Sequence, residues 1–113
     1  MSDFKETVRG DCMVVALAGK LDAATTPEIQ SALIERIRGG SKFMGLDFSA
    51  VSYLASSGLR MLLVLSRITT ELEGRIVLCG LNATMRDTLD VVGFLPNFQV
   101  AADEAGAFAL LQP

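Results

Sequence analysis

The feature that most limits how this chain can fold is a fully apolar, strand-like run. It lies within a regular alternation of strand-like and helix-like segments. Residues 13–18 read Met-Val-Val-Ala-Leu-Ala without one polar side chain. A strand of this kind is typical of a sheet that is covered on both faces. The other strand-like segments that precede a helical pattern are residues 43–48, 75–79 and 98–100. This alternation predicts mostly parallel strands joined by helices.

The first residues predict an antiparallel edge to that sheet. Residues 4–9 alternate apolar and polar side chains without a clean apolar face, and Gly10-Asp11 is a turn signal before the apolar run. The expected fold is therefore α/β, with a mostly parallel, mixed sheet of about five strands, an antiparallel edge hairpin and about four α-helices. A length of 113 residues fits a single domain over residues 1–113.

Local signals place the four helices. Pro27 suits a first helical turn, with Thr26 as the N-cap, and a capping box of Thr25 with Glu28 is the competing start. Gly39-Gly40 ends that helix. The other three helical patterns cover residues 59–72, 82–92 and 103–111. The loop before the first helix and the turn before the second should lie on one rim of the sheet, at the carboxyl ends of the strands.

Composition and charge exclude several classes of function. A net charge of −3 argues against nucleic-acid binding, which needs a basic face. The polar first nine residues and the lack of a long apolar run predict a cytoplasmic protein that does not insert into a membrane. Cys12 and Cys79 fit no zinc or redox spacing, so we expect reduced thiols in or near the core.

The sequence contains no histidine, which removes the usual base of Ser–His and Cys–His catalysis and the commonest transition-metal ligand. Asp22 and Asp47 are interpreted as loop aspartates that are solvated or bound to backbone N–H groups. We therefore predict no catalytic residue, no metal and no cofactor. The chain is expected to be a protein-binding domain and not an enzyme.

The segment Ser56-Ser57-Gly58 opens the most apolar helical pattern, in which residues 61–65 are apolar on every side. Part of that surface should face the sheet, and the rest should pack against another helix or a partner. A serine at this position has two interpretations. It caps the helix through its hydroxyl, or it carries a phosphate that the helix N-terminus tolerates and that alters a contact surface.

Two segments carry a family resemblance: residues 19–25, GKLDAAT, and residues 46–59, LDFSAVSYLASSGL. They resemble the STAS domain family, and more narrowly the bacterial anti-sigma factor antagonists. The resemblance implies that the protein binds an anti-sigma factor, a GHKL-type serine kinase, in a partner-switching system. It also implies that this kinase phosphorylates Ser56 and that a phosphatase acting on phospho-Ser56 reverses the step.

The same resemblance implies a partner-binding surface around Ser56, with Asp22 at a position close to the phosphorylated serine. One departure from the family pattern is Ala55, which stands where an aspartate is usual. The alternative function is a STAS scaffold subunit that is never phosphorylated, in a larger complex such as a lipid-transport ATPase assembly. The expected partner-binding residues are Asp22, Ala23, Ala24, Thr25, Ala55, Ser57, Gly58, Arg60 and Met61.

Overall fold

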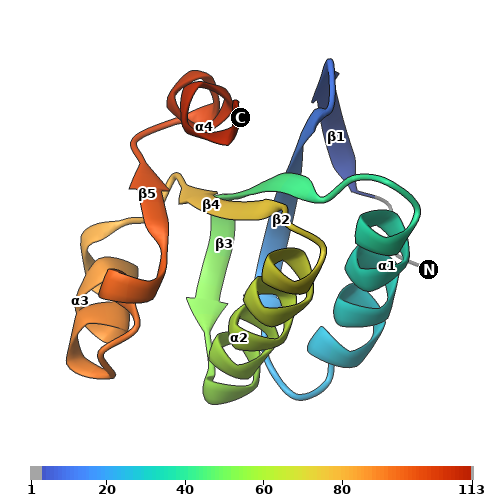
Figure 1. The fold of residues 1–113 in the computed structure, drawn as a ribbon. Helices are drawn as coiled ribbons and strands as arrows, with labels where there is room; N and C mark the ends of the chain where they lie inside the picture. Colours follow the sequence, from blue (N-terminus) through green and yellow to red (C-terminus); the bar gives the residue numbers. More distant parts are fainter. Residues whose placement is uncertain (1–3, 113) are drawn as a thin grey trace.

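The computed structural model describes residues 4–112, apart from the side chain of Asn97, and has the predicted order of strands and helices (Figure 1). A short 3-10 helix, Leu95–Asn97, is an addition to the predicted elements. The elements are β1 Lys5–Arg9, β2 Cys12–Leu21, α1 Thr26–Arg38, β3 Phe43–Leu54, α2 Ser56–Glu71, β4 Arg75–Cys79, α3 Ala83–Val91, β5 Gln99–Ala101 and α4 Glu104–Leu111.

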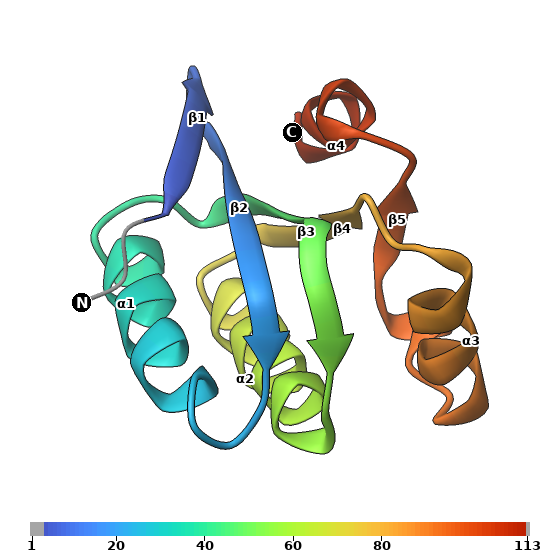
Figure 2. The same ribbon diagram turned by 180° about the vertical axis from the view of Figure 1, so that it is seen from behind.

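The five strands form one mixed sheet in the order β1-β2-β3-β4-β5. β1 is antiparallel to β2, and the other neighbours are parallel, so the predicted fold class is confirmed. Helices α1, α2 and α3 contribute to the core on one face, and α4 packs alone on the other face (Figures 1 and 2). No helix within residues 4–112 is both long and apolar enough to cross a bilayer.

Coverage of both faces explains the apolar run in β2. Val15 and Leu17 point into the larger core, beneath α1 and α2, whereas Cys12 and Val14 point into the smaller core, beneath α4. All four side chains are buried. A strand whose alternate residues enter two different cores has no polar side, as the sequence predicted.

β3 is longer than the sequence predicted, and this extension positions the site. Its pairing with β4 ends at the pair Asp47–Cys79, but its pairing with β2 continues to the pair Leu21–Leu54. The prediction that β3 ends near residue 48 was therefore wrong. Residues 49–54 extend the strand because the second half of β2 supplies hydrogen-bond partners beyond the rest of the sheet.

Arg9 and Arg75 hold α4 against the sheet. The Arg75 guanidinium donates to the carbonyl oxygens of Leu110, at 2.7 Å, and Gln112, at 3.3 Å, which lie at the carboxyl end of α4. Arg9 lies 4.6 Å from the centre of the Phe108 ring on the same helix. These contacts cover the smaller core, in which both cysteines are buried as free thiols, as predicted.

Burial, with smaller effects from the carboxylates of Asp47, Glu104 and Asp103, raises the pKa of the Cys79 thiol to about 12. The unfolded chain ionises this thiol near pH 9, so folding should lose stability as the pH rises above 9. By pH 10.5 the loss should be roughly 2 kcal/mol. Urea unfolding of the wild type and Cys79→Ala at pH 8 and pH 10.5 measures it. Equal pH dependence in the two proteins would contradict the prediction.

Candidate functional site

The β2–α1 loop and the beginning of α2 meet at the far end of the β2–β3 pair, as the sequence predicted (Figures 1 and 2). The N–H of Ala55 donates to the carbonyl oxygen of Leu21 at 2.9 Å, which ties the start of α2 to the end of β2. This bond places the segment that begins at Ser56 beside the segment that begins at Asp22. The two stretches of sequence that carry the family resemblance therefore lie side by side at this end of the sheet.

Asp22 organises the β2–α1 loop through its carboxylate and its backbone. The Oδ1 atom accepts hydrogen bonds from the N–H groups of Ala24, at 3.0 Å, and Thr25, at 3.1 Å. The carbonyl oxygen of Asp22 accepts from the N–H of Thr26 at 2.9 Å and from its hydroxyl at 2.8 Å. Asp22 is thus a loop aspartate bound to N–H groups, as predicted, and it keeps Ala23 and Ala24 exposed at the tip.

Of the two predicted starts of α1, the competing one has the N-cap residue right, but the side-chain cap that it expected is not formed. The helix begins at Thr26, with Thr25 at the N-cap position, but no side chain caps it. The Thr25 hydroxyl donates instead to the carbonyl oxygen of Lys20 at 2.6 Å and accepts from the N–H of Asp22 at 3.1 Å. The hydroxyls of Thr25 and Thr26 therefore bind the end of β2 and the preceding loop and do not cap the helix.

Ser56 is the first residue of α2 and is exposed. The N-cap position belongs to Ala55, which has an extended backbone, with φ −88° and ψ 174°, and no side-chain oxygen. The interpretation of Ser56 as a helix cap was therefore wrong. Its hydroxyl makes no hydrogen bond within the part of the chain that the structure describes. It is free to act as an acceptor of a phosphoryl group.

Ser57 and Gly58 point inward, unlike Ser56. A Cβ atom at position 58 would lie 2.6 Å from Leu54 Cδ1 and 3.2 Å from the carbonyl oxygen of Leu21. Glycine therefore allows α2 to approach the β2–β3 pair closely. The Ser57 hydroxyl is buried, with no hydrogen-bond partner in the described structure. Ser56 is consequently the one of the two serines that presents its hydroxyl to solvent.

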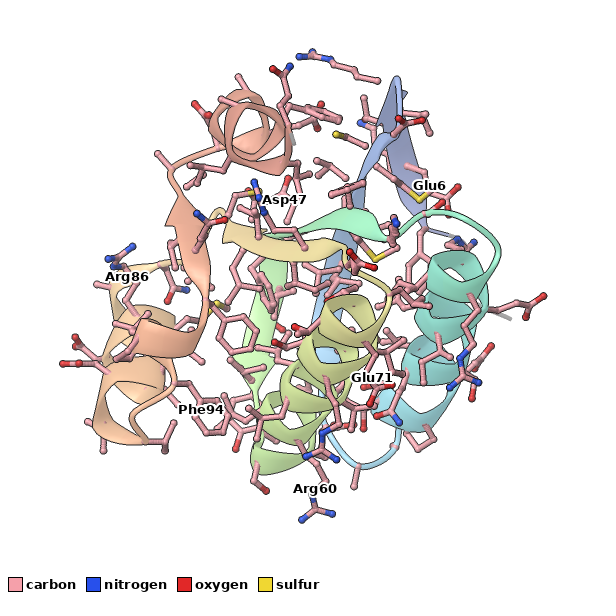
Figure 3. All side chains as sticks on the ribbon, viewed as in Figure 1. Glu6, Asp47, Arg60, Glu71, Arg86 and Phe94 are labelled. Carbon is pink, nitrogen blue, oxygen red and sulfur yellow. The ribbon has the colours of Figure 1, made fainter. Side chains whose placement is uncertain are left out.

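The outward side of α2, which we call the α2 stripe, is mostly polar. Met61 has no exposed surface, so its side chain is not available to a partner, contrary to the prediction. Leu59, Met61, Leu62 and Leu65 pack in the core beneath α1 and against the sheet, whereas Leu63 stays exposed, so one apolar residue of this helix is left to a partner. Figure 3 shows Arg60 extending away from the domain. The α2 stripe comprises Ser56, Arg60, Leu63 and Arg67, all exposed, and the exposed residues Thr70 and Glu71 follow it in the last turn of α2.

The predicted partner-binding residues divide into a surface group and a buried group. The buried group is Gly58 and Met61. Leu63 and Arg67 are exposed but are absent from the predicted set, although their spacing of seven and eleven residues from Ser56 places them on its side of a helix. The surface group, exposed or half-buried, is Asp22, Ala23, Ala24, Thr25, Ala55, Ser57 and Arg60, of which Ser57 is only partly accessible.

The electrostatics around Ser56 favour an added anion. The first turn of α2 contains no acidic residue. Positive partial charge at a helix N-terminus stabilises a phosphate there, and the cationic side chain of Arg60 lies one turn further along. Within residues 4–112, no three carboxylate or thiol side chains come close enough to hold a metal ion. The start of α2 therefore offers favourable electrostatics to an anion at position 56.

Comparisons with known proteins agree with this geometry. A family model described as STAS domain matches residues 4–107. A protein of Bordetella bronchiseptica, BtrV, named as a candidate anti-sigma factor antagonist, is 28% identical over 97 residues, which are 86% of this chain and 84% of that protein.

Two solved structures share the fold at 25% identity. The Bacillus cell fate determinant SpoIIAA in its phosphorylated form matches with a TM-score of 0.72, over 97% of this chain and 100% of that chain. A serine-to-glutamate variant of RsbS from Moorella thermoacetica matches with a TM-score of 0.84, over 97% of this chain and 95% of that chain.

Proposed function

Because this chain belongs to the STAS domain family, we propose that it is an anti-sigma factor antagonist controlled by phosphorylation. In this proposal the unmodified protein binds an anti-sigma factor that is a GHKL-type serine kinase. The kinase phosphorylates Ser56 and the complex dissociates, after which a phosphatase restores the unmodified form. The domain itself is a cytoplasmic binding module and catalyses no step.

The observation that carries the proposal is the exposed, unbonded hydroxyl of Ser56 at the first position of α2. It lies in the segment that resembles the family motif, and Ser57, the neighbouring candidate, has a buried hydroxyl. Two relatives support the proposal of a phosphorylated antagonist: BtrV by its name, and SpoIIAA by its phosphorylated form.

A phosphate at Ser56 would change binding without requiring a change of fold. It adds a charge of about −2 at pH 7. Free N–H groups and the helix dipole stabilise that charge, so α2 should keep its place. A partner that covers Ser56 in the complex would have to bury the phosphate or lose contact, and burying an unpaired charge costs several kcal/mol.

Ala55 alters how a kinase would recognise the segment. It occupies the N-cap of α2 in an extended conformation, so an aspartate there would have offered an acceptor for the first-turn N–H groups. Because the Gly58 N–H already donates to the Ala55 carbonyl oxygen, the absence of an aspartate leaves the N–H groups of Ser56 and Ser57 for a phosphate, and it removes a like charge beside it. Kinase recognition would therefore depend on the β2–α1 loop and the α2 stripe.

Incubation with a cognate kinase tests the assignment. Each GHKL-type serine kinase of the source organism is purified and mixed with the protein and ATP, and intact mass is measured. We expect one added phosphate with one of these kinases and none on Ser56→Ala, while Ser57→Ala is still modified. Binding without any phosphate, with every kinase, would contradict the switch and support the scaffold alternative.

A further inference from the structure

We propose that the α2 stripe docks against an acidic surface of the partner protein, and that phosphorylation acts by cancelling the positive charge of this stripe. The inference rests on the proposed function of Ser56 and adds the chemistry of the partner. The contact surface beside Ser56 is then basic with a small apolar centre, so the complementary face carries carboxylates around a small apolar area.

The stripe is defined by helix geometry. Residues four, seven and eleven positions after Ser56 lie on its side of α2, about 6, 10 and 16 Å along the axis. These are Arg60, Leu63 and Arg67, and all are exposed. The intervening apolar residues Leu59, Met61, Leu62 and Leu65 are buried in the core. The surface that continues from Ser56 is therefore narrow and carries two guanidinium groups.

Neither guanidinium group has a role within the domain. Arg60 and Arg67 make no hydrogen bond, ion pair or ring contact with another described residue. In contrast, Arg36 binds Glu6 and lies over the Phe4 ring, and Arg75 binds carbonyl oxygens of α4. Glu71, which is labelled in Figure 3, lies one turn beyond Arg67 on α2 and forms no ion pair with it in the described structure.

The combination of two arginines with Leu63 fits a protein partner better than a nucleic acid. Guanidinium groups pair bidentately with carboxylates, and Leu63, 37% exposed, supplies apolar area between them. Nucleic-acid binders neutralise many phosphates with a broad basic face, whereas this chain has a net charge of −3 and two cations on this stripe. Charge complementarity therefore favours an acidic protein surface.

The same arrangement explains how one phosphate would release the partner. Phosphoserine at position 56 would place a charge of about −2 one turn before Arg60. An anion four residues before a cation on a helix is the favourable order for an ion pair. The charge of the stripe, +2 from Arg60 and Arg67, would fall to about zero. The partner carboxylates would lose their cations and face the phosphate as a like charge.

Differential capture with charge-reversed variants tests the inference. Immobilised wild type, Arg60→Glu/Arg67→Glu and the control Arg38→Glu/Arg86→Glu are each exposed to nuclease-treated lysate of the source organism. The control makes the same charge change at exposed arginines of α1 and α3 (Arg86 is labelled in Figure 3). Proteins held by the wild type and the control but lost from the stripe variant are purified and titrated at two salt concentrations.

We expect each of Arg60→Glu and Arg67→Glu to weaken binding of the purified partner about tenfold or more, and Arg86→Glu to change it less than about twofold. Higher salt should weaken the wild type more than the stripe variant. Replacing partner carboxylates at the contact by arginine should restore binding of the stripe variant.

The inference would be overturned if the wild type and the stripe variant retained the same proteins in equal amounts, or if the wild type retained no protein that the stripe variant loses. It would also be overturned if the retained material were nucleic acid and not protein. Tight binding of a GHKL-type kinase by the stripe variant would remove this inference and leave the proposed function intact. If the captured partner were acidic and bound through the stripe but were not a kinase, the inference about the stripe would stand. The proposed function would then be wrong.

Discussion

Ser56→Asp should weaken binding to the cognate kinase about a hundredfold or more, whereas Ser56→Ala should bind as the wild type does. Aspartate puts a fixed negative charge at the first position of α2, beside the β2–α1 loop and one turn from Arg60. Like charges across an interface cost several kcal/mol, and a hundredfold change corresponds to about 2.7 kcal/mol. Isothermal titration with nucleotide-bound kinase measures the three affinities.

Thr84→Asp is the matched control, because it adds the same charge to an exposed residue in the first turn of α3. It should leave the affinity within about twofold of the wild type, since a rim or distant charge changes binding little. If Ser56→Asp and Ser56→Ala bound the kinase equally well, phosphorylation at this position would not be the switch.

Gly80→Ala should destabilise the domain by roughly 3–5 kcal/mol, because it combines a backbone cost with a steric collision. Gly80 follows β4 and has φ +70°, a left-handed conformation that an L residue adopts at a cost. A Cβ there would also collide with the Asp47 carboxylate and the Ser49 hydroxyl, and would lie 2.9 Å from the Ser49 backbone nitrogen. Urea denaturation measures the free energy of unfolding.

Gly93→Ala separates the two causes. Gly93 has φ +76°, but a Cβ at this position meets nothing within 4 Å. It should therefore show the backbone cost alone, about 1–2 kcal/mol. An equal loss of stability in Gly80→Ala and Gly93→Ala would mean that Asp47 and Ser49 of β3 move aside at no cost in free energy. Within β3, Asp47 Oδ1 accepts hydrogen bonds from the Ser49 N–H, at 2.9 Å, and hydroxyl, at 2.6 Å.

The site shows where the sequence argument stops being sufficient. The start of α2 at Ser56 was predictable because it follows from local signals: a small polar pair, a glycine and an apolar helical pattern. The inward position of Met61 and the outward position of Leu63 could not be predicted, because residues 61–65 are apolar on every side of the helix. Packing of α2 against α1 and the sheet decides between those sides.

By itself, the sequence determined the order of strands and helices, the antiparallel first strand and the burial of β2 on both faces. These follow from the spacing of apolar residues along each segment, which is a local property. The tertiary structure alone decided that β3 continues to Leu54 and that the hydroxyls of Thr25 and Thr26 bind the loop. It also decided which side of α2 is exposed. These features depend on neighbours that are distant in sequence, such as β2 beside β3 and α1 beside α2, and a local pattern does not contain them.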